Sequence, residues 1–325
     1  MTSTVVVTAS PEGVDRRIIE DLLAEVASVV YLSAVDGDRR SAVLEGSDFL
    51  ISDGPTGELT DEELGRLHGG QTIQLLSAGV DHVPLDRLPD GVRVLNNAGA
   101  YAEPMAEHVL AMYLALAKRL LTEHRNMADG EFNQFTPTRW ISGSTVGVFG
   151  FGAIGEAVAR ILRPLGVRVL AINRSGETDE SVAFVGTPDD LDRLLESCDC
   201  LVLTAPLTPE TRGVIGRDEL SRMADDAMLI NVARGELVDQ GDIYEHLRAT
   251  PEFRAGLEAW WTEPIRHGTF ELDYPFFELP NVLGSPHNSA IVPDVTELRT
   301  RHAVENVREA MAGEPGNVVD RTRGY

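Results

Sequence analysis

The sequence predicts an α/β fold with two parallel sheets, each covered by helices. Apolar, β-branched segments alternate with helical segments along most of the 325 residues, a pattern typical of parallel sheets with helices on their faces. The chain is longer than one ordinary compact core requires, and the alternation begins again at about residue 144. We therefore predict two doubly wound α/β domains.

The first half carries the elements of one such domain. Strands are expected at the apolar runs 4–9, 47–52, 72–77 and 92–97. After the first strand, helical spacing is shown by Leu22, Leu23, Val26 and Val29. Thr60 and Glu63 form a capping box that begins a further helix. A long helix is expected from about 103 to 127.

The second half repeats the alternation around a different set of strands. These are expected at 144–152, 167–172, 199–206, 227–233, 254–260 and 281–286. An amphipathic helix at 293–312 follows the last of them. The two halves together therefore predict two α/β units joined by helices.

Composition excludes several classes of partner. The formal net charge of −24 argues against nucleic acid and anionic membranes as partners. No apolar run approaches the roughly 20 residues that span a bilayer, and the first residues lack a signal-peptide pattern. Cys198 and Cys200 are interpreted as buried small hydrophobic residues. We expect a cytoplasmic protein.

Three glycines indicate a dinucleotide site. Gly150, Gly152 and Gly155 form Gly-x-Gly-x-x-Gly between an expected strand and an expected helix. In that context the glycines permit a tight turn, close approach of a pyrophosphate and close helix packing. The N-terminus of the helix then presents free N–H groups to the phosphates. The pattern predicts a Rossmann-type cofactor domain.

The residues after the next strand bear on the choice of cofactor. An acid at position 173 would bind the ribose 2′-hydroxyl and repel a 2′-phosphate, but Asn173, Arg174 and Ser175 stand there. Arg174 and Ser175 offer hydrogen-bond donors to a phosphate. We therefore predict a preference for NADP(H), with NAD(H) as a second cofactor. In the alternative, Arg174 only stacks on the adenine and the protein accepts both cofactors.

Three later segments each carry a reactive residue after an expected strand. Arg234 lies in INVARGELVD, Glu263 in GLEAWWTEP and His287 in LGSPHNSA. Ligands of parallel α/β sheets collect at the carboxyl ends of the strands, so these side chains can converge. An arginine fork suits a carboxylate next to a carbonyl, and a histidine can protonate the developing alkoxide. Glu263 would favour the imidazolium form of His287.

From about residue 70 to 290 the sequence resembles the D-isomer-specific 2-hydroxyacid dehydrogenases. The similar segments are LLSAGVDHVPL, MAEHVLAMYLALA, VGVFGFGAIG, LTAPLTPETRGVIG, INVARGELVD and SPH. The resemblance implies a flavodoxin-like substrate domain at 1–98 and 292–325, with the Rossmann cofactor domain at 99–291 inserted in it. It also implies a homodimer, a small 2-oxo or 2-hydroxy acid as substrate and hydride transfer without a metal.

By this resemblance, Arg234 binds the substrate carboxylate, Glu263 is the acidic partner and His287 is the acid and base. The substrate loop corresponds to Ser77, Ala78 and Gly79, and Tyr101 lies near the cleft. The residues expected at the cofactor are Gly150, Phe151, Gly152, Ala153, Ile154, Gly155, Asn173, Arg174, Ser175, Ala205, Pro206, Thr211, Val232, Ala233, Arg234, Glu258 and His287.

Two positions depart from the pattern of the family. Glu258 stands where relatives usually have an aspartate that helps to hold the nicotinamide. Trp260 and Trp261 replace a smaller apolar pair. One interpretation is that they pack, either inside the protein or at a subunit interface. The alternative is that they line the substrate pocket.

Rival functions differ in the residues they need. Dehydrogenases that depend on a catalytic lysine are disfavoured, because the one lysine, Lys118, lies in an expected helix far from every motif. A nucleotide-sensing, corepressor-like protein would keep the glycines without needing the complete triad. We therefore predict an enzyme, working as a 2-oxo-acid reductase, and keep the sensor as the alternative.

Overall fold

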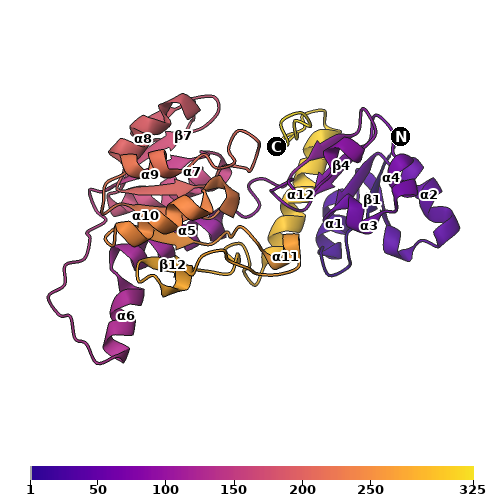
Figure 1. Cartoon of the computed structure of the whole chain (residues 1–325). Coiled ribbons are helices and arrows are strands. Elements are labelled where there is room, and N and C mark those ends of the chain that lie inside the picture. Colours follow the sequence, from indigo (N-terminus) through magenta and orange to yellow (C-terminus); the bar gives the residue numbers. More distant parts are fainter. Residues whose placement is uncertain (1) are drawn as a thin grey trace. The chain divides into compact units, whose positions relative to one another are not determined.

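The structure, a computed structural model, describes residues 2–325. It divides into two compact units, shown in Figure 1. Unit 1 combines the chain up to Tyr101 with Val292–Tyr325, and unit 2 is Ala102–Ile291. Unit 2 is therefore inserted between two segments of unit 1.

Unit 1 contains a parallel sheet of five strands in the order β2-β1-β3-β4-β5. The strands are β1 (Ser3–Val7), β2 (Ala27–Tyr31), β3 (Phe49–Ser52), β4 (Thr72–Leu75) and β5 (Arg93–Leu95). The helices are α1 (Arg16–Leu23), α2 (Gly37–Glu45), α3 (Pro55–Glu58), α4 (Asp61–Gly65) and α12 (Val295–Met311). This strand order is that of flavodoxin-like folds, as predicted.

Alternate residues of the unit 1 strands face two hydrophobic cores. Val6, Leu50 and Ile73 pack in one core with residues of α2 and α4. Val5 and Ile51 pack in the other core, with residues of α1 and α12. Both faces of the sheet are thus buried, as expected for a parallel sheet.

Unit 2 contains a parallel sheet of seven strands in the order β12-β11-β10-β9-β6-β7-β8. The strands are β6 (Thr145–Phe149), β7 (Arg168–Ile172), β8 (Phe184–Gly186), β9 (Cys200–Leu203), β10 (Met228–Asn231), β11 (Arg254–Leu257) and β12 (Val282–Gly284). The helices are α5 (Ala102–Ala117), α6 (Leu120–Ala128), α7 (Ala153–Leu162), α8 (Leu191–Ser197), α9 (Arg217–Arg222), α10 (Gln240–Ala249) and α11 (Pro264–His267).

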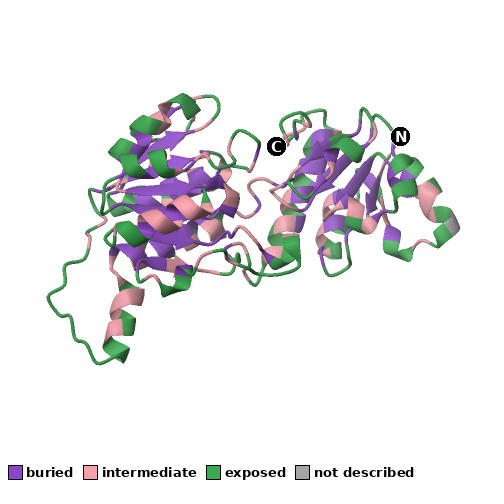
Figure 2. Cartoon of the chain, in the orientation of Figure 1, coloured by how far each residue is buried: buried purple, intermediate pink, exposed green. Residues whose placement is uncertain are grey.

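Counted from β6, the order of the first six strands is 3-2-1-4-5-6, which is the Rossmann order. One face of the sheet packs on α5 and α7, and the other on α8, α9 and α10. Figure 2 shows the buried strands between helices that are partly exposed. The strand order reverses between β6 and β9, and ligands of such sheets bind at this switch point.

One expected helical residue belongs to a strand. Val29 lies on β2, paired with Val5 of β1, because α1 ends at Leu23. The short β-branched run at 29–30 suits a strand better than a helix. Its place at a parallel sheet edge cannot be read from local periodicity.

The long helix expected at 103–127 is interrupted. Arg119 adopts a left-handed conformation with φ of 53° between α5 and α6. A left-handed residue interrupts the helical conformation, which separates α5 from α6. In Figure 1, α6 and the loop after it extend away from the sheet of unit 2.

No helix within residues 2–325 is both long and apolar enough to cross a membrane. Among the side chains that the structure describes, no group of three or more histidine, cysteine, aspartate or glutamate residues could hold a metal ion.

Candidate active site

The glycine turn has the geometry that a bound dinucleotide requires. Gly150 has φ of 96°, and a Cβ atom there would lie 2.3 Å from the backbone nitrogen of Ala205. A Cβ atom on Gly155 would lie 3.0 Å from Val148 Cγ1, so this glycine lets α7 pack closely on β6. A Cβ atom on Gly152 would meet nothing within 4 Å among the described residues. The N-terminus of α7 has no side-chain cap at Gly152, which leaves N–H groups for a phosphate.

The cofactor residues expected in unit 2 all follow strands of its sheet. Phe151, Ala153 and Ile154 lie in the glycine turn and at the start of α7 after β6; Ala205, Pro206 and Thr211 follow β9, and Val232 and Ala233 follow β10. Thr211 Oγ1 donates to the Pro206 carbonyl at 2.7 Å and accepts from Thr208 N at 2.8 Å. Its hydroxyl therefore shapes the loop beside the glycine turn.

Asn173 has a structural use that the sequence did not reveal. Its Nδ2 donates to the Glu177 carbonyl at 2.7 Å, and its Oδ1 accepts from Gly176 N at 2.7 Å. Ser175 Oγ also donates to Asn173 Oδ1, at 3.2 Å. These bonds fold the loop after β7, on which Arg174 is exposed.

Arg234 is positioned by the loop after β10. Asn231, fully buried, donates from Nδ2 to the Arg234 carbonyl at 2.8 Å, and its Oδ1 accepts from Ala233 N at 3.0 Å. A Cβ atom on Gly235 would lie 2.4 Å from the carbonyl carbon of Trp260. Glycine at this position therefore lets the arginine loop approach the segment that leads to Glu263. Asn231 is a positioning residue that the motif did not identify.

His287 and Glu263 are directly bonded. His287 Nδ1 lies 2.9 Å from Glu263 Oε1 and 2.8 Å from Oε2. Glu263 Oε1 also accepts from Trp260 N at 2.7 Å, which fixes the carboxylate. The His287 backbone has φ of 52°, and its N–H donates to the Glu258 carbonyl at 3.1 Å. With Nδ1 held by Glu263, the other ring nitrogen, Nε2, is the one left for a substrate.

The charges of the three residues act on one another. The hydrogen bond to Glu263 raises the pKa of His287, although burial and the Arg234 charge oppose this. Burial opposes ionisation of Glu263, yet its bonds to His287 and Trp260 N hold its pKa below the usual value. The Arg234 charge also lowers the pKa of Glu263. In unit 2, Glu263 and His287 are thus bonded to each other, and the charge of Arg234 acts on both.

Glu258 provides a test of whether the site fits a nicotinamide. The residue is fully buried, and Oε1 accepts from Ser289 N at 2.8 Å. Oε2 is buried and has no hydrogen-bond partner among the side chains and backbone that the structure describes. A buried acceptor without a partner is costly, and a carboxamide N–H would satisfy it. The residues present therefore fit the cofactor, and glutamate retains the acceptor of the usual aspartate.

The two tryptophans pack inside unit 2. Trp260 is only 3% exposed, and its Nε1 donates to the Ser285 carbonyl at 2.8 Å. The Trp261 ring stacks on Phe276 with centroids 5.4 Å apart, and its Nε1 donates to the Val238 carbonyl at 2.8 Å. Of the two alternatives for these residues, the structure favours packing.

The remaining predicted residues belong to unit 1. Ser77, Ala78 and Gly79 follow β4 and are partly exposed, and Ser77 Oγ donates to the Gly79 carbonyl at 2.9 Å. Tyr101 Oη donates to the Leu76 carbonyl at 2.5 Å, directly before this loop. The loop and Tyr101 therefore lie together at the carboxyl end of β4.

Comparison with known proteins agrees with this geometry. The sequence profile described as "D-isomer specific 2-hydroxyacid dehydrogenase, NAD binding domain" matches residues 110–289. Glyoxylate/hydroxypyruvate reductase B of Pectobacterium carotovorum is 30% identical over 92% of this chain and 94% of its own. Glycerate dehydrogenase of Methylorubrum extorquens is 32% identical, over 71% of this chain and 72% of its own.

A solved structure is also similar over the whole length. The D-isomer-specific 2-hydroxyacid dehydrogenase of Xanthobacter autotrophicus, in complex with NADPH and MES, has a TM-score of 0.79 and 28% identity, with 100% of both chains covered. The strand orders, the bond between Glu263 and His287 and these similarities lead to one conclusion: this chain belongs to the D-isomer-specific 2-hydroxyacid dehydrogenase family and is an NAD(P)-dependent enzyme.

Proposed function

We propose that this enzyme reduces a small 2-oxo acid to the D-2-hydroxy acid and prefers NADPH. The observation that carries the proposal is the direct bond between His287 and Glu263 beside Arg234. A bound nicotinamide supplies the hydride. Arg234 binds the carboxylate of the substrate, and His287 Nε2 gives a proton to the oxygen of the former carbonyl. Glu263 stabilises the imidazolium that makes this transfer possible.

Relatives that are glyoxylate/hydroxypyruvate reductases support the direction of reduction. The test is the loss of NADPH absorbance with a panel of 2-oxo acids. Turnover of at least one acid is expected, whereas a nucleotide-sensing protein would bind NADPH and consume none.

Arg234→Lys should raise the KM for the 2-oxo acid about tenfold. A lysine keeps the charge but cannot donate two parallel hydrogen bonds to a carboxylate, and one charge-assisted bond is worth about 1.5 kcal/mol or more. Initial rates at saturating NADPH measure the effect. Arg217→Lys, at an exposed ion pair with Asp242, is the control. An unchanged KM in Arg234→Lys would contradict the role given to Arg234.

The preference for NADPH is assigned to Arg174. Two similar proteins, from Xanthobacter autotrophicus and Rhizobium etli, were solved with NADPH and NADP, which supports NADP(H) as a cofactor. Arg174→Gln should lower kcat/KM for NADPH about tenfold, the effect of one charge-assisted bond, and leave NADH unaffected. Asn173→Asp is a poorer test, because it removes the bond to the Glu177 carbonyl. Equal losses with both cofactors would mean that Arg174 does not bind the 2′-phosphate.

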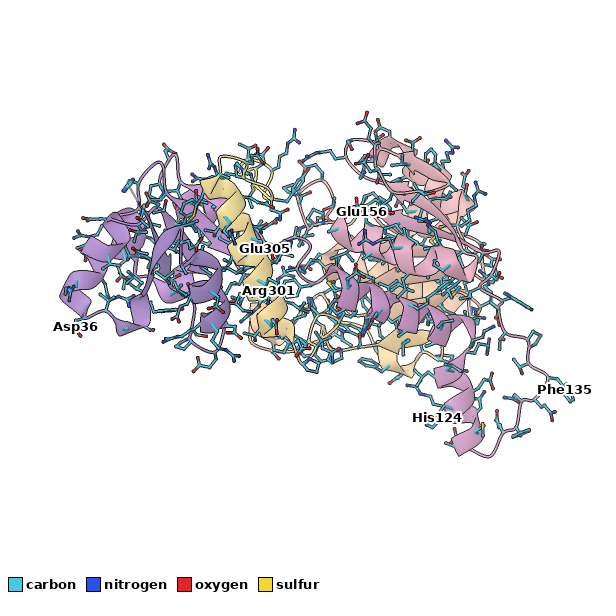
Figure 3. All side chains as sticks on the ribbon, turned by 180° about the vertical axis from the view of Figure 1, so that it is seen from behind. Asp36, His124, Phe135, Glu156, Arg301 and Glu305 are labelled. Atoms are coloured by element: carbon cyan, nitrogen blue, oxygen red, sulfur yellow. The ribbon has the colours of Figure 1, made fainter. Side chains whose placement is uncertain are left out.

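We further propose a homodimer in which α6 and the segment after it contact a second copy. Large apolar side chains are exposed there, and exposed apolar patches of this kind mark interaction surfaces: Leu120, Met127, Phe132, Phe135 and Trp140. Phe135 is 90% exposed and lies at the far end of this extension in Figure 3. Light scattering should give twice the chain mass of 35.4 kDa, and a monomer at micromolar concentration would refute the proposal.

A further inference from the structure

His287 lies on a loop of unit 2, so contacts from outside the loop determine where its ring lies. β12 ends at Gly284, and His287 follows with a left-handed backbone. Ser285 N donates to the Leu257 carbonyl at 3.0 Å. His287 N donates to the Glu258 carbonyl at 3.1 Å. These two bonds hold the N–H groups of the loop along the end of β11 (Arg254–Leu257).

Trp260 contacts both Glu263 and the loop of His287. Its backbone N–H donates to Glu263 Oε1 at 2.7 Å, and its indole Nε1 donates to the Ser285 carbonyl at 2.8 Å. The Glu263 carboxylate is in turn bonded to His287 Nδ1. The contacts therefore form a closed ring that returns to His287 along the chain from Ser285. A movement of the loop away from Glu263 would also stretch the indole bond.

Packing holds the indole ring independently of this bond. The ring centroid of Trp260 lies 5.6 Å from that of Phe270 and 5.3 Å from that of Phe277. A Cβ atom on Gly284 would lie 2.8 Å from Trp260 Cζ2, so glycine at the end of β12 makes room for the ring. Trp260→Phe therefore keeps an aromatic ring in this cluster and removes the indole N–H donor.

Ser285 is also held from α5. His108 Nε2 lies 3.0 Å from Ser285 Oγ, and α5 packs on one face of the unit 2 sheet. The N–H, the carbonyl and the hydroxyl of Ser285 thus each have a partner. Between Ser285 and His287 stands Pro286, whose ring restricts its φ. A fixed Ser285 therefore limits where the His287 ring can lie.

Trp261 makes the same kind of bond at a different place. Its Nε1 donates to the Val238 carbonyl at 2.8 Å, and its ring stacks on Phe276. Any buried indole N–H needs an acceptor. The acceptor of Trp261 lies in the segment after β10, whereas the acceptor of Trp260 lies two residues before His287. The position of the acceptor, and not the type of bond, distinguishes the two tryptophans.

We propose that Trp260 and His108 are positioning residues, which hold Ser285 and thereby keep the His287 ring at bonding distance from Glu263. This inference rests on the proposed function, because it assumes that His287 transfers the proton. Both residues act through Ser285, and both belong to unit 2.

Trp260→Phe should lower kcat for 2-oxo-acid reduction about tenfold, the loss expected for one hydrogen bond that fixes the reacting geometry. The KM for the acid should change little, because Arg234 is unaltered. The hydrogen bond to Glu263 and the charge of Glu258 raise the pKa of His287, whereas burial and the charge of Arg234 lower it. A looser bond to Glu263 lowers this pKa, so the decline of the reduction rate must begin at lower pH than in wild type.

The titration of the His287 imidazole in the cofactor-free protein gives a second measurement, which needs no turnover. It is followed by NMR and assigned by its absence from His287→Asn. Trp260→Phe should lower the pKa of His287, whereas Trp261→Phe, the matched control, should leave it unchanged. His108→Leu should also lower this pKa, and His108→Gln, whose amide can still bond to Ser285 Oγ, should restore it.

A His287 titration in Trp260→Phe that coincides with wild type would overturn the inference, and so would an equal shift in Trp261→Phe. If Trp260→Phe does not fold, His108→Leu is compared with His108→Gln, and equal titrations of His287 in the two would refute it. Absence of turnover with every 2-oxo acid would instead overturn the proposed function, and the titrations would still decide whether Ser285 is held in this way.

Discussion

Replacing His287 by asparagine should lower kcat for 2-oxo-acid reduction about a thousandfold, within the range expected for loss of a general acid. The imidazole is the proposed proton donor, and its bonds of 2.8 and 2.9 Å from Nδ1 to Glu263 raise its pKa. An asparagine amide is not acidic enough to donate a proton to the substrate oxygen. Binding of NADPH, measured by quenching of protein fluorescence, should persist, because the glycine turn is not altered.

Asparagine is the appropriate replacement because His287 has a positive φ of 52°. Asparagine tolerates the left-handed region better than alanine does, so loss of turnover will not be confused with backbone strain. His68→Asn, at an exposed histidine bonded to the Glu45 carbonyl, is the control. Turnover of His287→Asn within tenfold of wild type would remove His287 from the mechanism.

The parts of the site that follow strand ends could be predicted from the sequence. A Cβ atom on Gly150 would collide with Ala205, and one on Gly155 would be tightly crowded by Val148. The glycine spacing in the sequence therefore reflects close packing in the fold. Arg234 and His287 each follow a strand of one parallel sheet, and this topology places their loops at the same edge of the sheet. The local sequence therefore predicts site residues well where the fold places the ends of several strands at one edge of the sheet.

Elements that depend on distant contacts could not be predicted in the same way. Val29 continues a helical spacing, but its pairing with Val5 of β1 places it in a strand. Arg119 lies inside an apolar, helix-forming segment, and only its observed left-handed conformation shows that α5 ends there. Tertiary context overrides local propensity at such positions.

Ion pairs between residues that are far apart in the sequence could not be predicted either. Asp53 and Arg299 belong to segments with no recognisable motif, and each alone resembles an ordinary surface charge. Their pairing becomes visible only when α12 is seen to pack with α1 on the sheet of unit 1. Glu258 differs, because its position was predicted from the sequence. Only the structure shows that its Oε2 is buried without a hydrogen-bond partner among the described residues, which makes it a candidate acceptor.

Glu263→Gln should slow reduction about a hundredfold at alkaline pH and shift the pH dependence of kcat. The carboxylate raises the pKa of His287, so the imidazolium persists to higher pH than in an isolated histidine. Reduction needs the imidazolium and therefore declines as the pH rises through this raised pKa. Without the charge of Glu263 the pKa falls, and the decline must begin at lower pH.

The reverse reaction should respond in the opposite sense, which separates a catalytic effect from a structural one. Oxidation of the 2-hydroxy acid needs neutral His287, so its rate rises as the pH increases through the same pKa. In Glu263→Gln this rise should also move to lower pH. The rate of oxidation at acid pH should therefore fall less, relative to wild type, than the rate of reduction at alkaline pH. Initial rates in both directions across the pH range, with Glu263→Asp as the variant that keeps the charge, measure the difference. If the pH profiles of Glu263→Gln and wild type coincide, Glu263 only supports the Trp260 backbone, to which it is bonded at 2.7 Å.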